Sequence, residues 1–349
     1  MTKRKEYMAD QSSNPIKPLL SVRHLTTEFV SVDAPPARAV EDVSFDVYPG
    51  QTLGLVGESG CGKTTTMLSI MRLLPSAGRI TSGEVLFDDI DLLRITDRQM
   101  RHYRWKEMAM VFQGAMNALN PVRTVGDQIE EAILQHEPIG REAADRRVID
   151  LLEMVGIAKS RKDQYPHQYS GGMRQRAMIA MALACRPRLL FADEPTTALD
   201  VMIQAQILEL LEKIQRELGL AIVLVTHDLG VVAELCETVV VMYGGQVAEY
   251  GPIDVVYNAP QHPYTQRLLE AFPDLNRPAD QLMSIPGYPP RLNELPPGCR
   301  FEPRCHVKIA RCASIAPKLV VVDAQDKTSA FNTRHIAACH LLSGPEVND

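Results

Sequence analysis

Short segments of alternating apolar and polar residues follow the first residues of the chain. Residues 20–25 and 43–47 both show this alternation. Successive side chains of a strand point to opposite faces, so the pattern predicts an antiparallel sheet with one covered face. Residues 1–18 are polar, and we expect them to form a frayed N-terminal tail.

A second group of apolar segments has almost no polar interruptions. Residues 52–56, 189–192 and 221–226 belong to this group. Parallel strands that are covered on both faces have such sequences. Amphipathic segments that are predicted to be helices alternate with them, at residues 64–74, 201–218 and 229–236. Alternating strands and helices predict an α/β fold.

Charged, helix-forming sequence separates these apolar strands. It dominates residues 90–175, which we expect to form a helical insertion in a main domain that spans residues 19–259. A last hairpin is predicted around Gly244 and Gly245. Prolines are dense after Pro260, so residues 260–349 are expected to form an irregular linker and a small C-terminal extension that contains cysteines.

Composition and charge narrow the class of protein. The chain has 349 residues, of which 45% are hydrophobic, and a net charge of -6. This acidic balance gives no support for a nucleic-acid partner, which usually selects a basic surface. The longest apolar runs have the length of strands, and no apolar run follows the basic first residues. We therefore expect neither a spanning helix nor a signal peptide, and we expect any attachment to a membrane to depend on a partner.

A glycine-rich loop joins the strand at 52–56 to the helix that follows. Its sequence, GESGCGKT, is a complete Walker A motif. Glycines let backbone N–H groups converge on phosphate at a helix N-terminus. Lys63 is expected to bind the β- and γ-phosphates of ATP, and Thr64 to ligate Mg²⁺. The other candidate nucleotide contacts of this segment are Gly57, Ser59, Gly60, Cys61, Gly62 and Thr65.

Cys61 allows two interpretations. The first is a small residue that fits a tight loop. The second is a reactive thiol whose pKa is lowered by the positive field of the loop.

Two adjacent carboxylates end the apolar strand at 189–192. Asp193 is expected to hold Mg²⁺, directly or through its water shell, at the edge where open α/β sheets bind ligands. Glu194 is the predicted base or positioning group for the attacking water.

Two polar residues follow other predicted strands. Gln113 follows the apolar run 108–112 and is expected to bridge the metal or the water to the helical insertion. His227 follows the strand at 221–226, where it is expected to contact the γ-phosphate.

A second anion site is predicted at residues 170–175, which read SGGMRQ. Ser170, Gly171 and Gly172 lie at a predicted helix start, where backbone N–H groups favour phosphate. One ATP does not need two helix N-termini from one chain. We infer that this segment completes the site of another subunit.

The order of these motifs resembles that of ABC ATPases over residues 19–251. Walker A, Gln113, SGGMRQ, LLFADEP, Ala198-Leu199-Asp200 and His227 follow one another in the order of that family. The usual signature is LSGGQ, and Tyr169 and Met173 depart from it.

This resemblance implies a P-loop NTPase core of the RecA-like type with an antiparallel β subdomain and a helical subdomain. It also implies that Asp200 belongs to the nucleotide site and that Phe29 stacks on the adenine.

The C-terminal region resembles that of the ATPases of oligopeptide and dipeptide importers. The resemblance rests on QHPY at 261–264, IPG at 285–287, PP at 289–290, YPH at 165–167 and the SGGMRQR form of the signature. It implies a peripheral subunit at the cytoplasmic face of the inner membrane. The implied partners are a second ABC ATPase subunit, two transmembrane permease subunits and an extracytoplasmic solute-binding protein.

Other functions remain as alternatives. The same group includes ATPases for oligosaccharides and for nickel. A soluble ABC ATPase that acts on DNA or the ribosome is less consistent with this chain, which has no sustained heptads, no basic patch and one copy of each motif.

Four cysteines are concentrated near the C-terminus. Cys299, Cys305, Cys312 and Cys339 are separated by five, six and twenty-six residues, without the short C-x₂-C spacing of many zinc sites. Four thiolates suit a [4Fe–4S] cluster or zinc, and buried structural thiols are the third interpretation. The resemblance to peptide-importer ATPases implies the iron–sulfur cluster.

Overall fold

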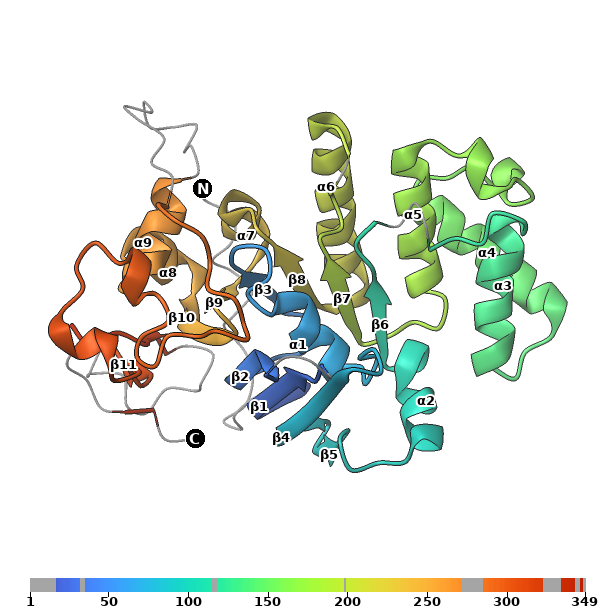
Figure 1. The fold of residues 1–349 in the computed structure, drawn as a ribbon. Helices are drawn as coiled ribbons and strands as arrows, with labels where there is room; N and C mark the ends of the chain where they lie inside the picture. Colours follow the sequence, from blue (N-terminus) through green and yellow to red (C-terminus); the bar gives the residue numbers. More distant parts are fainter. Residues whose placement is uncertain are drawn as a thin grey trace.

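The computed structural model of the chain describes residues 17–31, 35–114, 118–197, 199–271, 285–322, 334–342 and 346–347. The predicted N-terminal tail therefore lies outside the described residues except for Lys17 and Pro18. The described chain contains two sheets, with helices around the larger one (Figure 1).

The smaller sheet is antiparallel and has the strand order β2-β1-β4-β5. Its strands are β1 (Leu20–Phe29), β2 (Ala37–Val47), β4 (Gly78–Phe87) and β5 (Ile90–Asp91). The apolar side chains of β1 and β2 that were predicted to share a covered face are buried in one core cluster. The alternation in the sequence therefore predicted this sheet correctly.

The larger sheet has eight strands among the described residues, in the order β11-β12-β10-β9-β3-β8-β7-β6. They are β3 (Thr52–Val56), β6 (Met108–Val111), β7 (Leu189–Asp193), β8 (Ala221–Thr226), β9 (Thr238–Tyr243), β10 (Gln246–Pro252), β11 (Val320–Val321) and β12 (Ile336–Ala337). Strands β6, β7, β8, β3 and β9 are parallel and buried, and the continuous apolar runs predicted this for β3, β7 and β8. The phosphate-binding candidates follow their carboxyl ends.

Helices pack on both sides of this sheet and extend beyond its β6 edge. They are α1 (Lys63–Ile70), α2 (Asp97–Lys106), α3 (Val125–His136), α4 (Arg141–Met154), α5 (Gly171–Ala182), α6 (Val201–Leu218), α7 (Leu229–Leu235), α8 (Ile253–Asn258) and α9 (Pro263–Glu270). Figure 1 shows α3, α4 and α5 together as a separate helical group.

The segment predicted as a helical insertion is not helical throughout. Residues 90–175 include β5, which pairs with β4, and β6, which pairs with β7 at the edge of the large sheet. The four residues of β6 are buried and apolar, so they belong to the central sheet although charged segments surround them. The group of α3, α4 and α5 begins at Val125.

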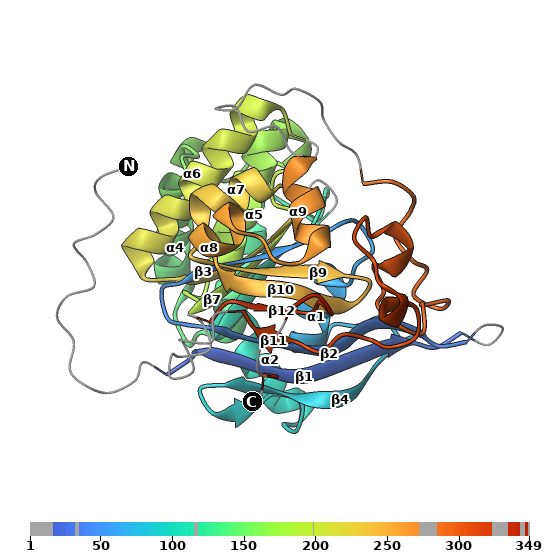
Figure 2. The same cartoon turned by 90° about the vertical axis from the view of Figure 1, so that its left-hand side faces the viewer.

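The C-terminal extension continues the large sheet. Strand β12 pairs with β10, so that Ala337 lies opposite Glu249, and β11 pairs with β12 (Figure 2). Among the described residues, no helix has the length and apolar character that crossing a membrane requires.

Candidate functional site

The phosphate loop between β3 and α1 is packed tightly against two strands. Gly57 has φ +148° and Gly62 has φ +106°, both in the region that favours glycine. A Cβ atom at Gly57 would collide with the carbonyl oxygen of Met242, and one at Gly62 with that of Ala39. Close packing therefore requires these two glycines.

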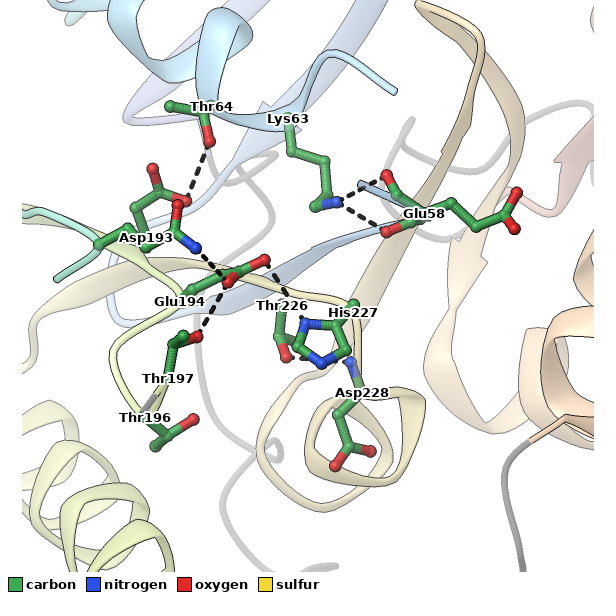
Figure 3. A network of polar contacts seen from close by, with 12 residues as sticks. Glu58, Lys63, Thr64, Asp193, Glu194, Thr196, Thr197, Thr226, His227 and Asp228 are labelled. Carbon is green, nitrogen blue, oxygen red and sulfur yellow. Dashed lines mark hydrogen bonds and ion pairs between the residues drawn. The ribbon is translucent and has the colours of Figure 1, made fainter. Parts of the chain in front are cut away.

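Lys63 is the first residue of α1, and its side chain turns back into the loop. Its Nζ donates hydrogen bonds to the carbonyl oxygens of Gly57, at 2.6 Å, and Glu58, at 3.1 Å (Figure 3). The side chain is buried, so the loop itself fixes the position of the ammonium group. The role of Lys63 as the cation that binds phosphate stays a prediction from the Walker A sequence.

Thr64 and Asp193 meet beside Lys63. The hydroxyl of Thr64 donates a 3.2 Å hydrogen bond to Oδ1 of Asp193, which ends β7. Burial raises the pKa of Asp193, the hydrogen bond from Thr64 lowers it, and the charge of Glu194 raises it. A hydroxyl and a carboxylate are oxygen ligands of the kind that Mg²⁺ selects, so these two residues fit the predicted metal.

The other predicted catalytic residues contact the carboxylate of Glu194. Its Oε2 accepts hydrogen bonds from Nε2 of Gln113, at 2.6 Å, and from Oγ1 of Thr197, at 2.8 Å. Its Oε1 lies 3.4 Å from Nδ1 of His227. Figure 3 shows Glu194 between Asp193 and His227. Glu194, Gln113 and His227, which are 114 positions apart at most, therefore form one polar network.

The backbone at Glu194 is unusual for a non-glycine residue. Its φ is +44°, and its N–H donates a 2.9 Å hydrogen bond to the carbonyl oxygen of Val225 in β8. A left-handed backbone is unfavourable for a residue with a Cβ and is often found at functional sites. The neighbouring strand holds the carboxylate in this orientation.

Cys61 is a buried residue of the phosphate loop. Its exposed fraction is 2%. Burial raises its pKa, and the opposing charge of Lys63 does not reverse this shift. The hypothesis of a lowered pKa is therefore wrong, and the interpretation as a small residue that fits the loop is the correct one.

The remaining loop candidates differ in position. Ser59 and Gly60 are exposed at the tip of the loop, and Thr65 is half-buried in the first turn of α1. Phe29 is half-buried at the end of β1, opposite Ala37 and Gly78.

Ser170 lies on a different part of the molecule from Lys63. It precedes α5, and its hydroxyl accepts a 3.3 Å hydrogen bond from the N–H of Met173. Gly171 and Gly172 form the first turn of this helix. Figures 1 and 2 both show α5 well apart from α1, which carries Lys63. The chain therefore presents two separate helix N-termini with anion-binding character.

Asp200 has a comparable capping role at α6. Its Oδ1 accepts a 3.0 Å hydrogen bond from the N–H of Ile203. It is exposed, as Ser170 is, while Ala198 of the same predicted motif lies outside the described residues.

Comparison with known proteins decides the family. Residues 40–197 match the family profile "ABC transporter". The chain is 48% identical over 329 residues to the dipeptide transport ATP-binding protein DppD of Bacillus subtilis, covering 93% of this chain and 98% of that one. It is also 48% identical over 303 residues to DppD of Escherichia coli, covering 86% and 92% of the two chains. The chain belongs to the ATP-binding proteins of ABC transporters.

The C-terminal region places this ABC ATPase in a narrower group. Residues 248–312 match the profile "Oligopeptide/dipeptide transporter, C-terminal region". A putative peptide import ATP-binding protein of Brucella ovis is 46% identical over 336 residues, which are 92% of this chain and 99% of that one. The predicted resemblance to the oligopeptide and dipeptide family is confirmed.

Solved structures confirm the fold of the ABC ATPase. The ATP-binding cassette MJ0796, solved as a dimer after hydrolysis with ADP and phosphate bound, has a TM-score of 0.60 at 28% identity. It covers 67% of this chain and 98% of its own. The cbiO1 protein of Clostridium perfringens also has a TM-score of 0.60, at 27% identity, and covers 69% of this chain and 91% of its own.

The four C-terminal cysteines surround one small cavity. Cys299, Cys305, Cys312 and Cys339 line it together with His262 and other residues. Burial, with a smaller contribution from the neighbouring thiols, raises the pKa of Cys299 to about 11. Among the described residues, however, no three His, Cys, Asp or Glu side chains are arranged to hold a metal ion. The residue types fit a metal cluster, but the arrangement of their side chains in this structure is not a ligand set.

Three contacts of the site were not predicted from the sequence. Thr197 holds Glu194, while Arg304 and Tyr264 of the C-terminal region hold Glu58 of the loop. A signal was available only for Arg304, because an acidic residue at the second position of the loop favours a basic partner.

Proposed function

We propose that this ABC ATPase drives the import of peptides by hydrolysing ATP at the site formed by Lys63, Thr64, Asp193 and Glu194. The observation that supports this most strongly is the position of Glu194, which Gln113, Thr197 and His227 hold beside the pair of Thr64 and Asp193. The similarity of both the core and the C-terminal region to peptide and dipeptide transport proteins supports peptides as the solute.

The site residues divide the reaction between them. Lys63 binds the β- and γ-phosphate oxygens and offsets their charge. Thr64 and Asp193 would hold Mg²⁺, which neutralises further phosphate charge when bound. Glu194 orients a water molecule and accepts its proton as the oxygen forms a bond to the γ-phosphorus. The bond from this phosphorus to the bridging oxygen then breaks, so that ADP and phosphate are the products.

His227 and Gln113 complete the site on the side of the γ-phosphate. We propose that the imidazole of His227, at the end of β8, donates a hydrogen bond to a phosphate oxygen. Gln113 joins Glu194 to the loop that leads into the helical group. Movement of that group would therefore change the position of the catalytic carboxylate.

The active unit is proposed to be a pair of ATPase subunits, with a second ABC ATPase as the partner. Ser170, Gly171 and Gly172 of one subunit would cover the ATP that Lys63 of the other subunit binds, and Asp200 and Phe29 would complete the nucleotide contacts. The separation of α5 from the phosphate loop within one chain supports this arrangement. The dimeric form of MJ0796 with hydrolysis products is consistent with it.

An apolar groove is proposed to receive a permease subunit. The groove measures about 320 Å³, and its lining includes Met71, Leu73, Trp105, Met110, Phe112 and Met178. Phe112 is 40% exposed and directly precedes Gln113, so an occupant of the groove would contact the segment that holds Glu194. Two such permease subunits and an extracytoplasmic solute-binding protein would complete the importer, with this chain at the cytoplasmic face of the inner membrane.

The cysteines at the C-terminal cavity are proposed to hold a [4Fe–4S] cluster, with zinc as the alternative. Their convergence on one cavity supports this. Anaerobically purified protein should be brown and contain about four iron atoms per chain. Colourless protein with neither iron nor zinc would contradict both proposals.

The solute is tested by reconstituting the complete importer with its binding protein in vesicles. Dipeptides or oligopeptides should be accumulated in an ATP-dependent manner, and they should stimulate hydrolysis. Accumulation of nickel or an oligosaccharide in place of peptides would contradict the proposed solute. If the chain instead purifies with DNA or ribosomes and without membrane proteins, the importer itself is wrong.

A further inference from the structure

The cysteine-bearing C-terminal region reaches back to the phosphate loop through Arg304. The guanidinium group of Arg304 donates two hydrogen bonds to the carboxylate of Glu58, the second residue of the loop. Nη1 lies 2.6 Å from Oε2, and Nη2 lies 3.0 Å from Oε1. Bidentate, charge-assisted hydrogen bonds of this kind are strong, and they fix the relative orientation of the two side chains.

Contacts with other residues also fix the position of the Arg304 side chain. Its Nε donates to the carbonyl oxygen of Pro286 at 2.9 Å, and Nη2 donates to that of Ile285 at 3.3 Å. Its Nη1 lies 3.3 Å from the hydroxyl of Tyr243 at the end of β9. The side chain is only 5% exposed, so solvent screens the contact weakly.

Glu58 also has a backbone contact with the C-terminal region. Its N–H donates a 2.9 Å hydrogen bond to the hydroxyl of Tyr264, whose ring packs 5.4 Å from that of Phe301. Its carbonyl oxygen accepts a hydrogen bond from Lys63. One residue of the loop therefore joins the phosphate-binding lysine to two residues of the C-terminal region.

The orientation of the Glu58 carboxylate indicates the effect of its contact with Arg304. In Figure 3 the carboxylate of Glu58 points away from Lys63 and Asp193. ATP brings several negative charges to this loop, so a free carboxylate next to it would repel the nucleotide. Arg304 neutralises that carboxylate and keeps it turned away from the phosphates.

We propose that Arg304 is a positioning residue of the nucleotide site, which acts on ATP binding through the carboxylate of Glu58. The proposal rests on the assignment of the loop as the ATP site. It makes the C-terminal region part of the nucleotide site and predicts that the charge on Glu58 is harmful to ATP binding unless Arg304 is present.

Four variants of the full-length chain test this, with the Kd of a fluorescent ATP analogue as the readout. Arg304→Met should raise this Kd about tenfold, a typical size for the coupling of two groups. Glu58→Gln removes the carboxylate charge itself, so it should raise the Kd less than Arg304→Met does. The double variant should recover most of the affinity that Arg304→Met loses, because it no longer has the unpaired carboxylate. Arg311→Met is the matched control, since Arg311 is an exposed arginine of the same segment, and it should not change the Kd.

The outcomes separate electrostatic positioning from a purely structural role. An unchanged Kd in Arg304→Met, or a double variant that binds as weakly as Arg304→Met, would overturn the proposal. If Arg304→Met does not fold, Arg304→Lys takes its place. This variant keeps the charge but only one hydrogen bond, and its Kd should rise less than tenfold and be restored by Glu58→Gln. A wild-type chain that does not bind the analogue, or a Lys63→Ala variant that binds it normally, would instead refute the nucleotide site itself.

Discussion

Gln113 donates a 2.6 Å hydrogen bond to the carboxylate of Glu194, and this contact joins the edge strand β6 to the end of β7. Gln113 directly follows Phe112 of the apolar groove, so the contact connects the proposed permease-binding groove with the proposed catalytic carboxylate. A displacement of Phe112 at the groove can therefore reach Glu194 through its neighbour Gln113.

Replacing Glu194 with Gln should separate ATP binding from hydrolysis. The amide keeps the size of the side chain but accepts no proton, so we expect turnover to fall by about 10²- to 10⁴-fold while ATP binding is retained. Single-turnover hydrolysis and equilibrium ATP binding measure the two effects. Asp254→Asn, at an exposed carboxylate in α8, is the control. Hydrolysis at a near-normal rate would remove Glu194 from its proposed role.

Replacing Lys63 with Ala should abolish both binding and turnover. The ammonium group is held by two carbonyl oxygens of the loop and is the proposed phosphate-binding cation, and alanine has no charge to take its place. Titration with labelled ATP should show no saturable binding at concentrations that saturate the wild type. The thermal midpoint of unfolding is measured in parallel, and retained ATP affinity in a folded variant would contradict the prediction.

Cys61 should react slowly with alkylating agents. Burial raises the pKa of its thiol, so at neutral pH the reactive thiolate is scarcer than for a free cysteine, and its fraction rises only as the pH approaches that raised value. Iodoacetamide labelling from pH 7 to pH 10, mapped by mass spectrometry, measures this. N-acetylcysteine provides the reference rate. Faster labelling of Cys61 than of this reference at pH 7 would show that the thiol is activated after all.

Replacing Ser170 with Ala should impair hydrolysis in the assembled ATPase pair and leave the affinity of the same chain for its own ATP unchanged. Loss of one group that contacts the reacting phosphate costs about 10²-fold in comparable sites. Ser170 also caps α5, so Ser170→Asn, which retains a capping side chain, shows how much of the loss comes from the helix itself. Weaker binding of ATP to the isolated Ser170→Ala chain would place Ser170 in its own site and contradict the paired arrangement.

The sequence predicted the parts of the site that depend on local pattern. The Walker A loop, the end of β7 and the end of β8 each combine a continuous apolar run with polar residues directly after it, and parallel strands bring such ends together. The helix predicted at 201–218 has the same bounds in the structure because its amphipathic period is long and uninterrupted.

The contacts that the sequence did not predict depend on tertiary structure. Arg304 and Glu58 are 246 positions apart, and no local pattern connects residues at that distance. Strands β11 and β12 have two residues each, too few to show a period of two. The raised pKa of Cys61 was not predicted either. Its cause is burial, which the sequence does not show, whereas the neighbouring Lys63 alone would lower the pKa.

The pairing of β12 with β10 has a consequence for biosynthesis. Glu249 is completely buried, and its carboxylate is 2.6 Å from Nε2 of His335, which lies just before β12. A nascent chain reaches Glu249 long before it reaches His335, so the carboxylate gains its imidazole partner, and the edge of the sheet gains its covering strand, only after translation has passed β12. A product that ends before β12 would expose that edge of the sheet and would leave the carboxylate of Glu249 without its imidazole partner, with the N–H groups of Gln261 and His262 as its remaining hydrogen-bond donors.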